Sequence, residues 1–409
     1  MSVAEIAATV GTPFYLYDGD ILRRRIGRLE GAFEGVPHLS CYAVKANDSL
    51  ALLAIAAAGG LGADIVSAGE LAKALRAGVP AERIVFSGVG KRREEIRAAL
   101  EAGIHSLNVE SLGELDVVAE EARALGRIAP VAVRLNPDVR TGTHAYVETG
   151  SAASKFGLGA QDSLTALERA AADPALEPVG ISFHIGSNVF DLAPIAAAAE
   201  RAVELWQTAT ERGIRLAQLD CGGGLGVRYD GDELVEVDVD AWASLLTKAA
   251  ARLDAELVVE PGRWLVAPAG VFVSRVLYTK RAGERTVAVC DGGMNDLIRP
   301  ALYGAYHPIE VVDAGDRPRG AVDVVGPVCE SGDFFALGRV LPVPVAGDLL
   351  AIGLAGAYGR VMSSTYNARP LCAEVLVEGD AWRIVREAGT IEDLIRGEEP
   401  TLGEYAAAG

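Results

Sequence analysis

Between residues 39 and 260 the chain alternates short apolar runs with longer Ala-rich or amphipathic segments. The runs have the length and β-branched content of strands, and the segments that follow them have helical periodicity. Eight runs can be counted, at 39–46, 63–67, 83–88, 106–109, 131–136, 180–186, 217–222 and 257–260. Eight strand–helix units predict an α/β fold, a closed (β/α)8 barrel of the triosephosphate-isomerase type.

Local signals support helices between these strands. Ser67 and Ser111 each precede a helical segment and are followed three residues later by Glu, the pattern of a capping box. Pro194 opens a further segment, where proline suits the first helical turn. An open doubly wound sheet is the alternative fold. No G-x-G-x-x-G opens a helix, and GGGLG at 222–226 misses that spacing, which disfavours a dinucleotide-binding sheet.

After about residue 271 the pattern changes to short strands separated by turns, with little helical periodicity. Strands are expected at 271–277, 286–290, 321–328, 348–352 and 373–377. This part predicts a separate all-β, Greek-key-like domain. An aromatic strand at 14–17 precedes the barrel and can join it. The expected organisation is therefore a barrel at 27–272 and a discontinuous β domain made of 1–26 and 273–409.

The amino-acid composition limits which classes of partner and which cellular compartment are expected. The 409 residues include 38 basic and 56 acidic side chains, for a net charge of −18, which disfavours nucleic acid and membrane surfaces. Five cysteines without C-x-x-C spacing fit a reduced protein and provide no disulfide framework or structural metal site. The first residues do not resemble a signal peptide, and no apolar stretch is long enough to span a membrane. We expect a cytoplasmic protein.

Active sites of such barrels form where the strands end. A polar group follows the end of almost every predicted strand, and Lys45 in YAVKAN is the first. A lysine on a strand is usually a solvated surface residue. A barrel strand is covered on both sides, however, so this amine is expected to be desolvated. A desolvated lysine has a lowered pKa and attacks carbonyl groups.

Three further groups fit a single cofactor. Gly222–Gly226 can bring backbone N–H groups close to a phosphate, although a plain tight turn is the alternative, and Arg263 adds a positive charge. Glu260 can pair with a protonated ring nitrogen or be an ion-paired rim residue. His184 can contact a ligand or be an ordinary core histidine. An amine, a phosphate cradle and a ring-nitrogen carboxylate together predict pyridoxal 5′-phosphate, and the carboxylate favours decarboxylation.

At these residues the chain resembles the pyridoxal-phosphate decarboxylases with an alanine-racemase-like barrel, in particular the diaminopimelate decarboxylase family. The resemblance covers almost the whole chain, with its segments in the same order. They are YAVKAN at 42–47, FSG at 86–88, HIGS at 184–187, GGGLG at 222–226, EPGR at 260–263, MNDLIRPALY at 294–303, CESGD at 329–333, GAYG at 356–359 and YNARP at 366–370.

The resemblance implies a role for each matching residue. In the barrel, Lys45 carries the cofactor covalently and His184 stacks on its ring. The other implied cofactor-binding residues are Asp64, Ser187, Gly222, Gly223, Gly224, Glu260, Gly262, Arg263 and Tyr358. In the β domain, Cys329 is the implied proton donor and Glu330 the reader of a distal amino group. The implied contacts to the substrate carboxylate are Arg299, Tyr303 and Arg263, with Tyr358 also touching substrate.

The resemblance further implies a homodimer in which the β domain of one subunit completes the site of the other. The implied reaction is decarboxylation of meso-2,6-diaminopimelate to L-lysine and carbon dioxide, the last step of lysine biosynthesis. Asn188, Gly304 and Arg360 depart from the usual family pattern. They motivate an alternative, a related decarboxylase acting on ornithine, lysine or a carrier-linked glutamate. A catalytically silent cofactor-binding protein is disfavoured because Lys45 and Cys329 are both present.

Overall fold

The computed structural model describes residues 2–139, 150, 154–229 and 235–398. Its contacts divide the chain into two compact units. The barrel unit comprises Leu22–Arg228 and Val235–Leu265, and the β unit comprises Met1–Ile21, Tyr229–Leu234 and Val266–Gly409. These bounds fall several residues before the expected boundaries at 27 and 273. The sequence also predicts a Gly/Ser/Thr-rich loop at 141–158, most of which lies outside the described residues.

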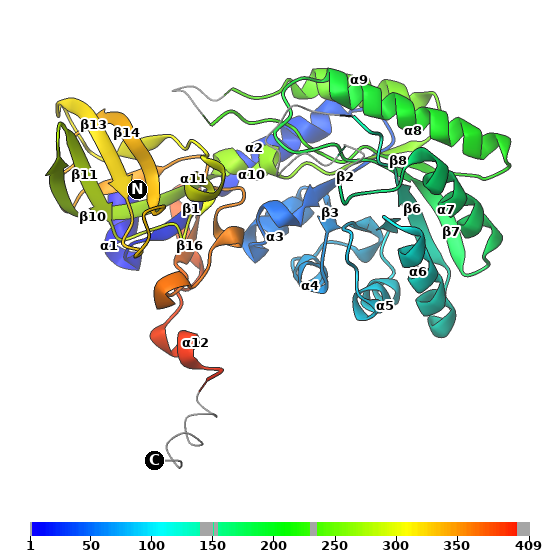
Figure 1. Ribbon diagram of the computed structural model, residues 1–409, viewed down its shortest axis with the longest axis horizontal. Helices are drawn as coiled ribbons and strands as arrows, with labels where there is room; N and C mark the ends of the chain where they lie inside the picture. Colours follow the sequence, from blue (N-terminus) through cyan, green and yellow to red (C-terminus); the bar gives the residue numbers. More distant parts are fainter. Residues whose placement is uncertain (1, 140–149, 151–153, 230–234, 399–409) are drawn as a thin grey trace, which may run out of the picture. The chain divides into compact units, whose positions relative to one another are not determined.

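Eight parallel strands form a closed barrel, which confirms the predicted fold (Figure 1). Each strand pairs with the next along the chain, and the last closes the barrel by pairing His38 of the first with Leu257. Each of the eight predicted runs overlaps one of these strands. They are β2 (His38–Ala43), β3 (Gly62–Ile65), β4 (Ile84–Phe86), β5 (Ser106–Val109), β6 (Ala129–Arg134), β7 (Leu176–Ser182), β8 (Gln218–Asp220) and β9 (Glu256–Val259).

Helices cover the outside of the barrel strands (Figure 1). Their inner faces are apolar, and Trp242 and Leu246 of one of them are wholly buried. A long helix, α2 (Gly19–Ala32), precedes the first barrel strand and begins in the β unit. The others are α3 (Leu50–Ala58), α4 (Ala68–Arg76), α5 (Arg93–Ala102), α6 (Leu112–Leu125), α7 (Ala160–Ala172), α8 (Ala193–Glu211), α9 (Val239–Ala251), the short α10 (Arg263–Val266) and the 3₁₀ turn η2 (Ala81–Arg83).

The two predicted capping serines do begin helices α4 and α6. Ser67 Oγ accepts the N–H of Glu70 at 3.2 Å, and Ser111 Oγ accepts that of Glu114 at 3.1 Å. The reciprocal half of the capping box is absent at both described sites. Each glutamate instead accepts the backbone N–H of the residue before its serine, Val66 at 2.7 Å and Glu110 at 2.8 Å. The carboxylates therefore tie each helix start back to the end of the preceding barrel strand.

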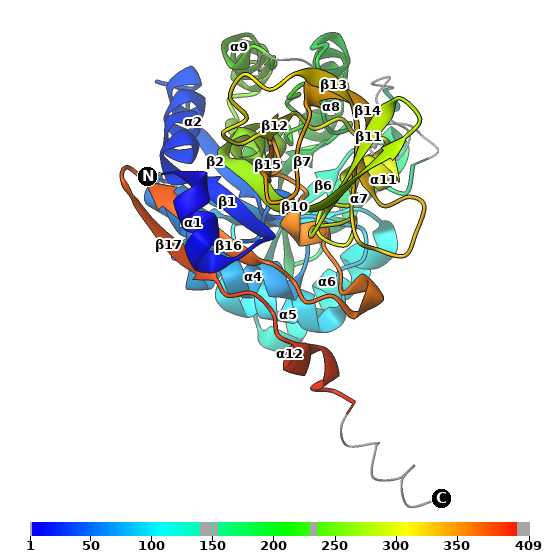
Figure 2. The same ribbon diagram turned by 90° about the vertical axis from the view of Figure 1, so that its left-hand side faces the viewer.

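The β unit contains a nine-stranded, mostly antiparallel sheet (Figure 2). As expected, the N-terminal strand belongs to it, because β1 (Phe14–Asp18) pairs antiparallel with β10 (Gly270–Ala282) and parallel with β16 (Ala373–Glu378). The remaining strands are β11 (Arg285–Cys290), β12 (Ile309–Val311), β13 (Arg319–Val325), β14 (Phe334–Pro342), β15 (Leu349–Ile352) and β17 (Ala381–Arg386).

Three of these strands, β12, β14 and β17, were not predicted. β14 leaves Leu337 and Val340 exposed, so its apolar residues do not follow a simple inward alternation. The unit also contains helical elements that the sequence pattern did not predict. They are α1 (Val3–Val10), α11 (Arg299–Tyr303), α12 (Ile391–Ile395), η3 (Ala267–Ala269), η4 (Arg360–Met362) and η5 (Tyr366–Ala368). Among the described residues, no helix is long and apolar enough to cross a membrane.

Candidate active site

Lys45 stands just beyond the end of the first barrel strand. β2 ends at Ala43, and Val44–Ala46 form a 3₁₀ turn, η1, so Lys45 does not lie within the strand as predicted. Its amine pairs with the carboxylate of Asp64 from β3, which is completely buried. The Lys45 side chain is 35% exposed to solvent. This side chain is more exposed than expected for a desolvated lysine, and a neighbouring carboxylate holds the amine in place.

Glu260 and Asp220 form the centre of a buried hydrogen-bonded circuit at the ends of β9 and β8. Their carboxyl groups hydrogen-bond to one another. Ser87 Oγ donates to Glu260 Oε1 at 3.3 Å. The Asn108 amide donates to both Ser87 Oγ at 3.1 Å and Asp220 Oδ2 at 2.9 Å, and the Gly222 N–H donates to Asp220 Oδ1 at 2.9 Å. These donors orient both carboxyl groups.

Burial raises the pKa of both members of this acid pair. Burial raises the pKa of Glu260 well above its usual range, and the charges of Asp220 and Asp64 raise it further. Burial also raises the pKa of Asp220, but the donors at Gly222 and Asn108 act in the opposite direction. A carboxylate that accepts several N–H bonds is stabilised in its charged form. The hydrogen-bond donors thus favour the ionised form of Asp220, whereas burial and the neighbouring negative charges favour the protonated form of Glu260.

The glycine run after β8 places backbone where any side chain would collide. A Cβ at Gly223 would lie 2.2 Å from the carbonyl oxygen of Glu260, and one at Gly224 would lie 2.6 Å from that of Gly186. Gly222 and Gly224 also have φ of +62° and +94°, in the region that favours glycine. The loop therefore presents bare backbone beside the acid pair.

His184 is partly buried against this loop and is neutral. Burial, together with the positive charges of Arg134 and Lys45, holds the pKa of His184 well below its ordinary value. The Gly223 N–H donates to His184 Nδ1 at 3.3 Å, so the ring proton is on Nε2. A neutral, fixed imidazole offers a flat face to a ligand ring without adding charge.

Arg263 begins α10, directly after strand β9, and is nearly buried. Its Nη2 and Nε donate to Ser187 Oγ at 3.1 and 3.3 Å. A neutral hydroxyl orients the guanidinium without cancelling its charge. Gly262, just before it, packs its Cα against Ala43 and Ala46, where a Cβ would lie 2.9 and 3.0 Å from their methyl groups. Gly262 thus packs closely on the turn that carries Lys45, and the Arg263 guanidinium lies at Ser187.

Two other charged pairs at the strand ends are structural. Arg134 Nη1 contacts Glu110 Oε1 at 2.7 Å, and both side chains are nearly buried. Lys91 Nζ contacts Glu114 Oε1 at 2.7 Å with 1% of the lysine side chain exposed. Because each charge here is compensated by its partner, neither pair offers a free charge to a ligand. Asn136, a further strand-end residue, lines a separate cleft.

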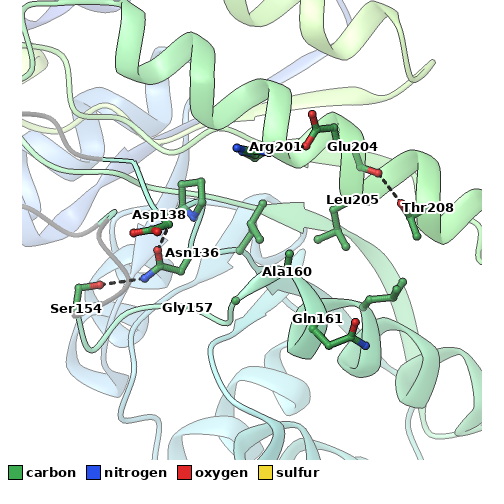
Figure 3. A pocket seen from close by; sticks show the side chains of 14 residues that line it. Asn136, Asp138, Ser154, Gly157, Ala160, Gln161, Arg201, Glu204, Leu205 and Thr208 are labelled. Atoms are coloured by element: carbon green, nitrogen blue, oxygen red, sulfur yellow. Dashed lines mark hydrogen bonds and ion pairs between the residues drawn. The ribbon is translucent and has the colours of Figure 1, made fainter.

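That cleft lies at the end of β6, between α7 and α8 (Figure 3). Its volume is about 710 Å³, and it contains none of the predicted site residues. Asn136 donates to Ser154 Oγ at 3.2 Å and accepts the N–H of Asp138 at 3.1 Å, so its polar groups are used within the loop (Figure 3). The cleft is therefore distinct from the cluster around Lys45.

The β unit contributes a second set of predicted residues, described here on their own. Arg299, at the start of α11, is 6% exposed. Its Nη1 lies 2.9 Å from His307 Nε2, and its guanidinium lies 4.4 Å from the centre of the Tyr229 ring. Tyr303 ends the same helix and is partly buried. Tyr358 is partly buried with φ of +54°, a conformation that non-glycine residues adopt rarely.

Cys329 and Glu330 lie on the surface of the β unit. All five cysteines are described, and Cys329 alone is exposed. Its backbone N–H donates to Asn367 Oδ1 at 2.9 Å, and Glu330 hydrogen-bonds to the Tyr366 hydroxyl. The loop that carries these two side chains is thus fixed by residues of the YNARP segment.

The sequence reasoning missed Asp220, Ser87 and His307. Asp220 ends strand β8, so the strand-end rule that selected Glu260 applies to it equally. Ser87 follows β4 at the same level of the barrel. His307 is part of no recognised pattern, and only the packing of the β unit brings it to Arg299.

The barrel cluster fits pyridoxal phosphate. Bare glycine backbone and the Arg263 cation suit its phosphate, the Glu260–Asp220 pair suits its ring nitrogen, and the Lys45 amine suits its aldehyde. Asp64 Oδ1 and Asn108 Oδ1 are buried and accept no hydrogen bond in the described structure. Acceptors left unsatisfied in this way are typical of a pocket that a polar ligand completes.

Comparisons with known proteins agree with this geometry. The family model for the pyridoxal-dependent decarboxylases, pyridoxal binding domain, matches residues 20–267. The chain is 47% identical to the diaminopimelate decarboxylase of Zymomonas mobilis over 398 residues, 97% of this chain and 94% of that protein. The crystal structure of the Helicobacter pylori diaminopimelate decarboxylase complexed with L-lysine matches with a TM-score of 0.94 at 41% identity, covering 98% of this chain and all of that one. The chain therefore belongs to the family of pyridoxal-dependent decarboxylases that includes the diaminopimelate decarboxylases.

Proposed function

We propose that this chain is a carboxy-lyase that converts meso-2,6-diaminopimelate to L-lysine and carbon dioxide. The observation that carries the proposal is that one chain contains both a set of side chains suited to the cofactor and a buried cation suited to a substrate carboxylate. The barrel unit has the Lys45–Asp64 pair beside the Glu260–Asp220 acids, and the β unit has the buried Arg299. Relatives that align with about 97% of this chain are named diaminopimelate decarboxylase. The crystal structure of one such relative contains L-lysine.

In the barrel, each side chain would hold one part of the cofactor. Pyridoxal phosphate, when bound, withdraws electrons from the α-carbon of an attached amino acid. Lys45 would hold it covalently, Glu260 would face its ring nitrogen, and the neutral His184 would lie on its ring. The phosphate would meet Gly222–Gly224, Gly262, Ser187 and Arg263. Asp64 would keep the Lys45 amine at the strand end.

The substrate has two amino-acid ends, so a second recognition set is required beside the reacting end. A buried guanidinium is well suited to a carboxylate, because a charge-assisted hydrogen bond is stronger where water is excluded. We assign Arg299 and Tyr303, with Arg263, to substrate carboxylate, and Glu330 to the distal ammonium. Tyr358 would contact both cofactor and substrate.

Cys329 Sγ would return a proton to the α-carbon after carbon dioxide leaves. Its exposed position on the β unit, next to Glu330, suits a role in the site of a second subunit. We therefore propose a homodimer in which each barrel site is completed by the β unit of the other copy. We also propose that the protein is cytoplasmic, which fits its five free cysteines.

The reaction is tested with purified protein, pyridoxal phosphate and meso-diaminopimelate. We expect stoichiometric release of carbon dioxide and formation of L-lysine. A substrate panel with ornithine, lysine and glutamate, ranked by kcat/KM, serves as the control. Absence of lysine under saturating cofactor would refute the proposal.

The shared site is tested by mixing two inactive variants, Lys45→Ala and Cys329→Ala, under conditions of subunit exchange. A mixed dimer has one intact site, so about a quarter of wild-type activity is expected at random exchange. Lack of any recovery, with exchange confirmed by differently tagged subunits, would contradict a site shared between subunits.

The residues that depart from the family pattern have structural roles, which disfavours the alternative substrates. Asn188 has φ of +65°, which asparagine tolerates, and its Oδ1 accepts the N–H of Val227 at 2.9 Å. Gly304 ends helix α11 with φ of +59°. Arg360 Nε contacts the buried Glu374 at 3.1 Å. None of these contacts requires a different substrate.

A further inference from the structure

His307 is a wholly buried histidine of the β unit with both ring nitrogens engaged. It lies in the loop between α11 and β12 and has 0% exposure. Nδ1 is 2.9 Å from the carbonyl oxygen of Gly353, and Nε2 is 2.9 Å from Nη1 of Arg299. The ring also packs edge-on against Tyr229, with 5.2 Å between ring centres.

These two partners determine the protonation of the ring. A carbonyl oxygen only accepts, so Nδ1 must carry a proton and donate it to Gly353. A guanidinium only donates, so Nε2 must keep its lone pair and accept from Arg299. His307 is therefore neutral and in a single tautomer. A proton on Nε2 would put two cations 2.9 Å apart.

The contacts of Arg299 differ from those of other arginines in the same unit. Arg285 Nη1 contacts the Asp323 carboxylate at 3.1 Å, and Arg360 contacts Glu374. In both cases a carboxylate cancels much of the positive charge. The His307 nitrogen and the Tyr229 ring are neutral contacts that orient the Arg299 guanidinium. The neutral His307 acceptor thus fixes the direction of Nη1 without itself cancelling the positive charge.

We propose that His307 is a positioning residue for substrate recognition, which orients Arg299 toward the carboxylate at the end of the substrate that does not react. The inference rests on the proposed function, in which Arg299 binds that carboxylate. His307 does not touch the substrate itself. It acts through the 2.9 Å contact with Nη1 and through its anchor on Gly353.

The test compares two ligands that differ in the relevant carboxylate, L-lysine and cadaverine, which has none. Binding to the holoenzyme is followed by the absorbance of the bound cofactor. In His307→Leu, which has no acceptor, we expect the Kd of L-lysine to rise about tenfold, consistent with loss of one hydrogen bond to a charged group. The Kd of cadaverine should stay within about twofold. KM for diaminopimelate should rise in parallel, with kcat nearly unchanged.

His307→Gln is the conservative variant, because its Oε1 can accept from Arg299 in place of Nε2. We expect it to keep L-lysine affinity within about threefold of the wild type. His307→Asn can reach Gly353 but not Arg299, and should behave like His307→Leu. If the Leu variant does not fold, comparing L-lysine affinity between His307→Gln and His307→Asn still separates a side chain that can accept from Arg299 from one that cannot.

Equal weakening of both ligands, or no weakening of either, would overturn the inference. The first result would mean that His307 only supports the local fold, and the second that Arg299 is oriented without it. Wild-type lysine formation is measured in the same preparation. An active wild type with no selective effect refutes only the role of His307, whereas a wild type that forms no lysine refutes the proposed function.

Discussion

The barrel unit and the β unit contain buried groups of opposite charge. At the ends of the barrel strands, the carboxyl groups of Asp64, Asp220 and Glu260 are buried close together, and the pKa of Glu260 is raised as a result. In the β unit, the buried Arg299 is held by the neutral His307. The first arrangement favours positively charged groups, such as an ammonium or a protonated ring nitrogen. The second favours a carboxylate.

This difference shows how the partner of a buried charge indicates its role. Arg134 and Lys91 lie at the barrel strand ends too, but each is paired with a glutamate at 2.7 Å. A compensated pair holds the fold, and breaking it costs about 3–5 kcal/mol. Arg263 and Arg299 contact a hydroxyl and an imidazole, respectively. Such neutral acceptors orient a guanidinium without themselves cancelling its charge.

The largest effect is expected from Lys45→Ala, which removes the amine from the anionic barrel site. Decarboxylation should fall by at least about 10³-fold because the covalent attachment of the cofactor is lost. Lys73→Ala is a matched control. Lys73 also pairs with an aspartate, Asp48, and its side chain has 29% exposure against 35% for Lys45. Steady-state rates near wild type are expected for the control, and an active Lys45→Ala enzyme would contradict the assignment.

The next largest effect is expected from Arg299→Gln, which removes the cation from the β unit. KM for diaminopimelate should rise about 30-fold, with a smaller change in kcat, because a charge-assisted hydrogen bond contributes roughly 2 kcal/mol. Arg285→Gln is the control, since its guanidinium is half exposed and already paired with Asp323. Similar KM values in both variants would mean that Arg299 has no special part in recognition.

Gly223→Ala tests whether the barrel site depends on bare backbone. The added methyl would lie 2.2 Å from the carbonyl oxygen of Glu260, so the loop must shift. We expect a loss of about 1–3 kcal/mol in the free energy of unfolding and weaker binding of pyridoxal phosphate. Gly90→Ala has open space around the new methyl and should change neither. Equal phosphate and cofactor affinities in the two variants would argue against a phosphate cradle at Gly223.

The smallest effect concerns the pH dependence of stability in cofactor-free protein. The folded-state pKa of Glu260 is raised, by burial first and by neighbouring charges second, so above pH 4.5 and up to that raised pKa the folded protein holds a proton that the unfolded chain has lost. The free energy of unfolding therefore falls as pH rises, by at most about 1.4 kcal/mol per pH unit for this group. Glu260→Gln should remove that contribution and give a flatter profile.

Urea unfolding of both proteins at several pH values from 5 to 8 gives the difference between their profiles. Taking the difference cancels groups common to both, including His184, whose lowered pKa acts in the opposite direction. Parallel profiles would show that Glu260 does not hold the proton in the acid pair.

The barrel could be predicted from sequence because strands buried on both sides are nearly continuous apolar runs, and because side chains at their ends share one rim. That rule selected Lys45 and Glu260. It could not show that β2 ends at Ala43 and leaves Lys45 on a turn paired with Asp64, since this depends on the register between strands. The contact between His307 and Arg299 depends on tertiary packing of the β unit. Strand β14 was missed because exposed apolar residues such as Leu337 and Val340 break the alternation expected of a strand. Strand β17 was missed because none of its side chains is buried and their polarity is mixed.

The most direct test of the central claim is to locate the cofactor attachment. Holoenzyme is reduced with borohydride and digested, and the peptide that carries the pyridoxyl group is sequenced by mass spectrometry. We expect the adduct on Lys45, in the peptide that contains YAVKAN. An adduct on another lysine, such as Lys73 or Lys91, would contradict the assignment of the barrel site.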